Sequence, residues 1–225
     1  MSGFRKQLNM AGQSFFGKMS ASTTHELKNA LAIINENAGL LNDLSQMVES
    51  GAELSAERLK SITGRIRKQV VRADDVTTKL NQFAHSMEHP IEPLELAGLV
   101  HTVLDLGRRI IEQRRMEFEI ETPQAPVTVS SNRFYLMNLI WSCIEIAMDS
   151  VDSDACITID IRATSAGGSV SFNRIDQGPE PLKIRELTDM EKALLQGMGA
   201  ELIAAETTGG FVLKLPASCR YQFFK

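Results

Sequence analysis

A histidine followed by a carboxylate, with an amide one helical turn later, stands in the segment THELKNAL at residues 24–31. The imidazole of His25 is partly neutral near pH 7, so one ring nitrogen is free to attack phosphorus as a nucleophile. Glu26 could take the proton of the other ring nitrogen or fix the tautomer. Asn29 lies four residues after His25 and could position a water molecule or a phosphoryl oxygen. We therefore predict a catalytic group of His25, Glu26 and Asn29, with His25 carrying the phosphoryl group; the alternative is an ordinary histidine on a solvated helix face.

Two long helices within residues 1–89 are expected to position this group. This part contains no proline, and the pattern breaks near Gly51, a typical helix stop, with a restart near Ser55. The first helix carries two adjacent apolar stripes, and the second carries one seam in steps of three and four. The stripes are Leu27, Leu31, Ile34, Ala38, Leu41 and Val48, and Phe16, Met19, Thr23, Ala30, Ile33, Leu40, Leu44 and Met47; the seam is Leu59, Ile62, Ile66, Gln69, Ala73, Val76, Leu80, Phe83 and Met87.

The width of the apolar face on the first helix predicts a further partner. Two adjacent stripes are too wide for one partner helix to cover. Two hairpins pairing into a four-helix bundle would cover them, so we predict a homodimer. The alternative is that the first helix packs on the C-terminal part of the same chain. Because His25 lies outside both stripes, its ring is expected to face solvent.

The residues after Pro90 and Pro93 show a mixed pattern that predicts an α/β sandwich, with a mixed sheet under helices. The whole chain is therefore α+β, with a helical hairpin at 1–89 and a sandwich at 91–225. Helices are predicted at 96–114, at 132–150 with Asn132 as N-cap, and at 186–200; strands are predicted at 116–121, 127–129, 156–163, 169–175, 202–206 and 211–215, the last two as a hairpin around Gly209-Gly210.

The segment with His25 resembles the phospho-acceptor box of sensor histidine kinases, which reads H-E-[LI]-[KR]-N-P-L. Residues 1–89 resemble the dimerisation and histidine phosphotransfer hairpin of these kinases. Residues 91–225 follow the element order of their ATP-binding domain, of the GHKL or Bergerat type. Within it, residues 92–96 resemble the entry strand, 138–148 the helix with the metal-binding asparagines, 175–179 the D-x-G-x-G adenine box, and 209–216 the last strand. The resemblance implies that His25 exchanges phosphoryl groups with receiver domains of response regulators.

The chain departs from the kinase pattern where ATP would bind. The metal-binding asparagines fall on Ser142 and Ile146, and isoleucine offers Mg²⁺ no oxygen ligand. Asp176 and Gly178 are remnants of the adenine box, but its second glycine is replaced by Glu180.

The lid that follows this box in kinases is also altered. Only residues 181–191 stand in its place, and Gly197 and Gly199 suit a helix stop rather than a phosphate cradle. We therefore expect a degenerate domain with no metal site and no cofactor. Ala30 also replaces the proline of the acceptor box, which suggests a straighter first helix.

Composition excludes several other classes of protein. Of 225 residues, 43% are hydrophobic and 23% charged, as in a globular protein, and the net charge of −4 without a Lys/Arg block argues against nucleic-acid binding. No apolar run approaches the roughly 20 residues that span a bilayer, and the N-terminus lacks the apolar core of a signal peptide. The three cysteines form no CxxC or Cys/His cluster, so we expect a reducing cytoplasm and neither zinc nor a disulfide framework.

These observations favour a two-component signal transduction protein in which His25 transfers phosphoryl groups to or from receiver domains without ATP. One alternative is a minimal active sensor histidine kinase that phosphorylates His25 with ATP and Mg²⁺. Another is a non-catalytic regulator that binds a kinase or a response regulator and in which His25 is dispensable.

Overall fold

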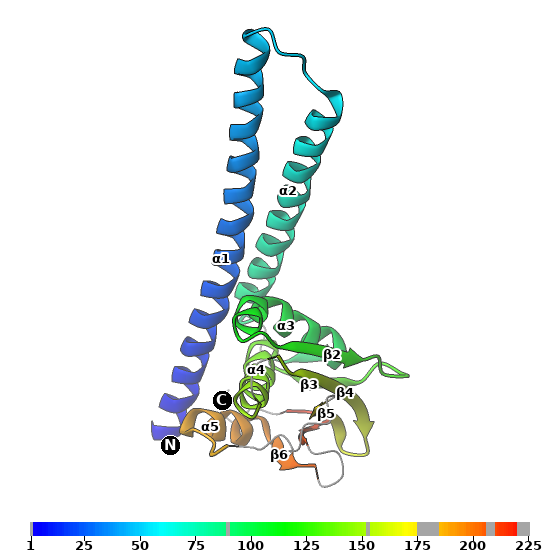
Figure 1. Ribbon diagram of the computed structural model, residues 1–225. Coiled ribbons are helices and arrows are strands. Elements are labelled where there is room, and N and C mark those ends of the chain that lie inside the picture. The colour runs from blue at the N-terminus through cyan, green and yellow to red at the C-terminus, as the bar shows by residue number, and fades with distance from the viewer. Residues whose placement is uncertain (1, 89–90, 152–153, 175–184, 206–209, 220–225) are drawn as a thin grey trace.

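The structure is a computed structural model that describes residues 2–88, 91–151, 154–174, 185–205 and 210–219. Two long antiparallel helices, α1 (Ser2–Glu49) and α2 (Ala56–His85), form a hairpin whose far half projects from an α/β sandwich (Figure 1). The N-terminal half of α1 runs along the sandwich (Figure 1). None of the helices in the described residues is long and apolar enough to cross a membrane.

The sandwich is a mixed sheet covered by helices, as predicted. Its helices are α3 (Leu96–Gln113), α4 (Arg133–Asp149) and α5 (Asp189–Met198). Five strands pair in the order β2-β4-β5-β7-β6, where β2 (Glu117–Glu121) and β4 (Cys156–Thr164) are parallel and β5 (Gly167–Arg174), β7 (Phe211–Pro216) and β6 (Glu201–Ala204) continue antiparallel. A separate antiparallel pair joins β1 (Glu92–Glu95) to β3 (Thr128–Ser131). The predicted α+β class is confirmed.

Helix α4 is buried on nearly all sides and forms the centre of the sandwich. It begins where predicted, because the Asn132 side chain accepts a hydrogen bond from the backbone N–H of Tyr135. A helix that is apolar all round needs cover on several faces. In the described structure α3, α5 and part of α1 provide that cover, and the apolar residues of β4 at Ile157, Ile159 and Ile161 are buried in the same core.

The first half of α1 packs on the sandwich of its own chain. Phe15 is buried, with its ring 5.4 Å from that of Phe83 on α2 and 5.6 Å from that of Phe134 on α4. Met19 is fully buried one turn later. The alternative prediction, that this helix packs on the C-terminal part, therefore holds for its first half.

The far half of the hairpin leaves apolar side chains exposed. The predicted seam of α2 faces α1, with Ile62, Val76 and Phe83 buried. Several large apolar residues of the far half are exposed nonetheless: Leu31, Leu40, Met47, Val48, Leu54, Val70 and Val71. This is the surface that a second hairpin would cover, and the homodimer stays a prediction.

Some predicted boundaries shift because a local motif decides them. Helix α5 begins three residues later than predicted, since Thr188 and Glu191 form a capping box there. Gly199, with a φ of 61°, ends that helix as predicted. Helix α2 ends at His85, so Met87 of the predicted seam lies beyond it and is exposed.

Candidate functional site

His25 lies on α1 beyond the contact with the core of the sandwich, and its side chain is half-buried rather than fully in solvent. Nδ2 of Asn29, one turn later, lies 3.2 Å from Nδ1 of His25. The two predicted residues are therefore in contact, because residues four apart face the same side of a helix.

The contact with Asn29 links the amide orientation to the tautomer of His25. With the amide nitrogen toward the ring, Asn29 donates to Nδ1 and the ring proton is on Nε2. With the amide turned over, which preserves its shape, Nδ1–H donates to Oδ1 and Nε2 keeps a free lone pair. In the second arrangement Nε2 is the ring nitrogen that could act as a nucleophile, and the hydrogen bond at Nδ1 holds the ring in place.

Glu26 faces a different direction from the one expected. Successive residues of an α-helix point about 100° apart. The Glu26 carboxylate lies 3.4 Å from the guanidinium of Arg72 on α2, and only 12% of its side chain is exposed. In the described structure its ion pair is thus with Arg72, and the expected hydrogen bond to His25 is not formed.

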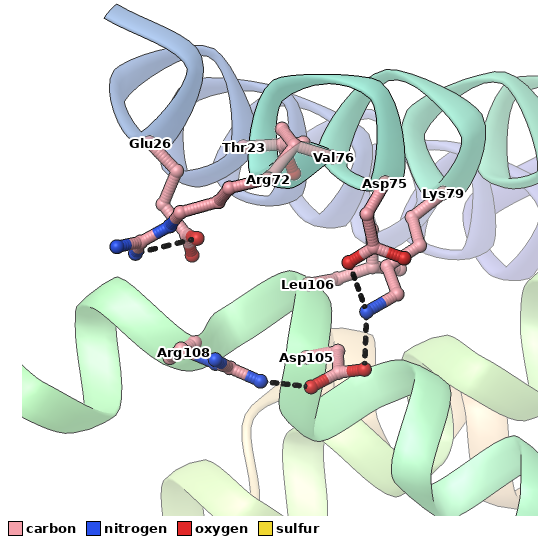
Figure 2. Close-up of a pocket in the computed structure, with 9 residues that line it drawn as sticks. All are labelled: Thr23, Glu26, Arg72, Asp75, Val76, Lys79, Asp105, Leu106 and Arg108. Carbon is pink, nitrogen blue, oxygen red and sulfur yellow. Dashed lines mark hydrogen bonds and ion pairs between the residues drawn. The ribbon is translucent and has the colours of Figure 1, made fainter. Parts of the chain in front are cut away.

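Glu26 lines a small polar cavity of about 40 Å³ between α1, α2 and α3 (Figure 2). At its other end, Lys79 of α2 lies 2.8 Å from both Asp75 of α2 and Asp105 of α3. Asp105 also pairs with Arg108 one turn later. The charged groups therefore join the hairpin to the sandwich, beside the helix that carries His25.

The pKa values in this cluster follow from its ion pairs. Burial alone would raise the pKa of Asp105, but hydrogen bonds and charges from Lys79 and Arg108 outweigh it and lower that pKa. Burial alone would lower the pKa of Lys79, but Asp105 and Asp75 outweigh it and raise that pKa. The Asp105 carboxylate raises the pKa of Arg108, and the charge of Glu26 adds to the effect. All three groups are thus held in their charged forms.

The sequence reasoning missed this cluster. One signal was present, because Asp75 and Lys79 stand four residues apart on a predicted helix. Nothing in the sequence pattern places Asp105 or Arg72 beside them.

The α4 positions that resemble metal-binding asparagines do not fit a Mg²⁺ ion. Ile146 is buried in the apolar core, and the Ser142 hydroxyl donates to the backbone carbonyl of Asn138. Glu145, the nearby carboxylate, pairs with Lys18 of α1. These residues supply no set of oxygen ligands for Mg²⁺.

The remnants of the adenine box, Asp176 and Gly178, lie outside the described residues, as does Glu180. The described residues contain no group of three or more His, Cys, Asp or Glu side chains arranged to hold a metal ion.

No protein-family model and no curated protein matches this sequence. Several of the solved structures that match this chain are histidine kinases. The catalytic domain of the kinase ThkA is 14% identical, with a TM-score of 0.47, and the match covers 59% of this chain and 100% of that chain. The histidine kinase AdeS of Acinetobacter baumannii is 13% identical, with a TM-score of 0.44 and coverage of 86% and 98%.

A structure of ThkA in complex with the response regulator TrrA is 17% identical, with a TM-score of 0.45 and coverage of 95% and 64%. All three of these solved structures are of histidine kinases, and each is at most 17% identical to this chain.

Proposed function

We propose that this chain is a two-component signalling protein that transfers phosphoryl groups between receiver domains through His25, without binding ATP. The observation that carries the proposal is the contact between Asn29 and the Nδ1 atom of His25. It holds one imidazole in place on a long helix, and with the Asn29 amide turned over Nε2 keeps a lone pair for reaction. Phosphoryl transfer depends mainly on the orientation of the nucleophile, because alignment of the reacting groups supplies much of the rate enhancement.

The transfer step uses the two ring nitrogens differently. Nε2 of His25 attacks the phosphorus of a receiver phospho-aspartate, the bond from phosphorus to the carboxylate oxygen breaks, and the aspartate leaves as a carboxylate. The product ring is positively charged until Nδ1 releases its proton. With the Asn29 amide turned over, the amide oxygen would accept a hydrogen bond from that N–H meanwhile. The reverse step passes the phosphoryl group to a second receiver, and each receiver brings its own Mg²⁺ and lysine.

The residues of α4 support the part of the proposal that excludes ATP binding. Ile146 and Ser142 occupy the metal-binding positions, and the first half of α1 packs against the same helix through the ion pair of Lys18 with Glu145. We take the residue types at these positions and this packing as support for a protein that does not bind ATP. The minimal active kinase is the alternative that a nucleotide-binding measurement tests.

We also propose that the protein acts as a homodimer. The exposed apolar residues of the far hairpin lie on both helices and on the connection between them, and most lie on the predicted stripes of α1. Pairing with a second hairpin would remove this area from water, which is favourable in proportion to the area buried. The phospho-acceptor helices of two protomers would then share one four-helix bundle.

The proposed function is tested with two phosphoryl donors, phosphoramidate and ATP with Mg²⁺, both carrying ³²P. We expect acid-labile label from phosphoramidate in the wild type, none in His25→Gln, and full label in the matched control His101→Gln, which alters an exposed histidine of α3. We expect no label from ATP and no heat of nucleotide binding by calorimetry. Labelled protein should then lose its phosphoryl group to a receiver domain.

The other outcomes separate the alternatives. Label from ATP that disappears in His25→Gln would make the protein an active kinase. No label from either donor, together with a His25→Gln variant that keeps its effect in cells, would support the non-catalytic regulator.

Asn29 acts as a positioning residue in this scheme, and its pH profile distinguishes that role from a purely structural one. Asn29→Asp keeps an oxygen toward Nδ1, so transfer should continue, with its optimum shifted to higher pH because a carboxylate favours the imidazolium. Asn29→Leu removes the contact and should slow transfer about 10- to 100-fold. Equal rates and equal pH profiles for all three proteins would refute the role.

A further inference from the structure

Glu26 follows His25 in the chain, yet its carboxylate is turned out of the solvent and toward α2. Only 12% of its side chain is exposed, and the carboxylate lies 3.4 Å from the guanidinium of Arg72. Figure 2 shows the two side chains meeting at one end of the cavity between α1, α2 and α3. A charged side chain without a partner extends into water, because burying an unpaired charge costs free energy. The ion pair with Arg72 therefore accounts for the position of Glu26.

Among the described residues, Arg72 is the one cation that forms an ion pair with Glu26. The hydrogen bond to Asp105 is the main reason why the pKa of Arg108 is raised, and the charge of Glu26 only adds to it. Without Arg72, the Glu26 carboxylate would thus lack an ion-pair partner. The other charged groups that line the cavity pair among themselves: Lys79 with Asp75 and Asp105, and Arg108 with Asp105.

An unpaired carboxylate at position 26 would disturb the chemistry of the neighbouring imidazole. It would favour the imidazolium form of His25, which has no lone pair for attack on phosphorus. It would also repel the phosphoryl group that His25 carries in the proposed reaction, because both groups are negative. The other charged side chain close to His25 on α1 is Lys28, which is exposed. The half-buried Glu26 is therefore the charge that has to be balanced.

We propose that Arg72 is a positioning residue for His25 and acts through Glu26. It holds the Glu26 carboxylate on the α2 side of α1 and cancels its charge. The imidazole of His25 then contacts the neutral amide of Asn29 instead of a carboxylate. The inference rests on the proposed function, since it assigns a further residue to the same histidine.

The test measures how the labelling of His25 by ³²P-phosphoramidate depends on pH. Only the neutral ring reacts, so the pH midpoint of labelling follows the charge around His25. We expect Arg72→Gln to raise this midpoint by about 0.5 to 1 pH unit, which slows labelling below the midpoint about 3- to 10-fold. The pH dependence of the reagent itself cancels when each variant is compared with the wild type.

Three further variants distinguish this role from that of a structural clamp between α1 and α2. Arg72→Lys keeps the positive charge and should retain the wild-type midpoint. The double variant Glu26→Gln with Arg72→Gln removes both charges, so it should return to the wild-type midpoint although the clamp is still broken. Arg65→Gln is the matched control, because Arg65 is exposed and lies seven residues before Arg72 on nearly the same face of α2. Its midpoint should equal that of the wild type.

A second measurement needs no phosphoryl donor. The ring Cε1–H signal of His25 in a ¹H–¹³C correlation spectrum, assigned with the His25→Gln variant, reports protonation of the ring as the pH is changed. Its midpoint should rise in Arg72→Gln and return to the wild-type value in the double variant. The role of Arg72 is thus tested even in a protein that takes no label.

Two results would overturn the inference. Equal midpoints for the wild type and Arg72→Gln would show that Arg72 has no influence on His25. A raised midpoint that persists in the double variant would show that Arg72 does not act through Glu26. A wild type that takes no label at any pH, but whose ring signal shows the expected shifts, would refute phosphotransfer and support the role of Arg72. Failure of the proposed function and failure of this inference therefore give different results.

Discussion

Gly107 of α3 stands directly against the ring of Trp141 on α4, and this contact predicts the effect of one methyl group. A Cβ atom added at Gly107 would lie 2.1 Å from Cζ3, 2.6 Å from Cη2 and 3.0 Å from Cε3 of the indole. The optimal distance between non-bonded carbon atoms is about 3.5 to 4.0 Å, so α3 and α4 would have to separate by about 1.4 Å or more. Trp141 is buried, with only 1% of its surface exposed.

Two opposing effects determine how much Gly107→Ala changes the free energy of unfolding. Overpacking a core costs about 1 to 3 kcal/mol, and a clash of this size belongs at the upper end. Replacing glycine by alanine inside a helix gains up to about 1 kcal/mol. We therefore expect the free energy of unfolding to fall by about 2 kcal/mol, which lowers Tm by about 4 to 8 °C for a chain of this length.

The matched control is Gly64→Ala in α2, where nothing lies within 4 Å of the added Cβ. In that variant only the higher helix propensity of alanine acts, so its free energy of unfolding should rise by up to about 1 kcal/mol. The assay is unfolding in urea followed by far-ultraviolet circular dichroism, which does not depend on the tryptophan signal. If the two variants were equally stable, the packing of α3 on α4 described above would be wrong.

Three further perturbations test the same structure. Phe15→Ala should lower the free energy of unfolding by about 3 to 5 kcal/mol, because a buried aromatic side chain between the hairpin and the sandwich is lost; a loss below about 1 kcal/mol in urea unfolding would contradict this packing. Asp105→Asn should cost about 1 kcal/mol or less at pH 7, because the ion pairs with Lys79 and Arg108 are partly exposed. Folding lowers the pKa of Asp105, so the ionised Asp105 stabilises the protein above its unfolded pKa of about 3.9. This stabilisation disappears as the pH falls through the folded pKa. A difference in stability between wild type and variant that persisted at still lower pH would refute the ion pairing of Asp105. Leu40→Glu places a charge on the exposed apolar stripe and should convert the proposed dimer to monomers in sedimentation velocity, with helix content unchanged; a wild type that is already monomeric would rule out the dimer.

Features set by neighbours in the sequence were predictable. The two long helices follow from apolar periodicity, and the caps at Ser55 and Asn132 follow from residue type at the helix starts. The contact of His25 with Asn29 belongs to the same class, because a spacing of four residues on a helix fixes it before any tertiary packing. The alternation in β4 likewise predicted which of its residues are buried.

Contacts between distant parts of the chain were not predictable in this way. Periodicity shows which face of α1 is apolar, but it does not show which surface covers that face. The structure decides that the first half of α1 lies on the sandwich, with Phe15 against Phe134, and that the second half does not. Helical geometry separates Glu26 from His25, but only the packing of α2 supplies Arg72 as its partner.

The sequence by itself therefore determined most of the helices and strands, the caps at Ser55 and Asn132, and the contact of His25 with Asn29 on α1, since each depends on residues within one or two turns or within one strand. Tertiary structure alone decided the bridge from Lys79 to Asp105, the contact of Gly107 with Trp141, and the small cavity that Glu26 lines. Each of these depends on the distance and angle between packed elements, and side chains far apart in the sequence fix those quantities jointly.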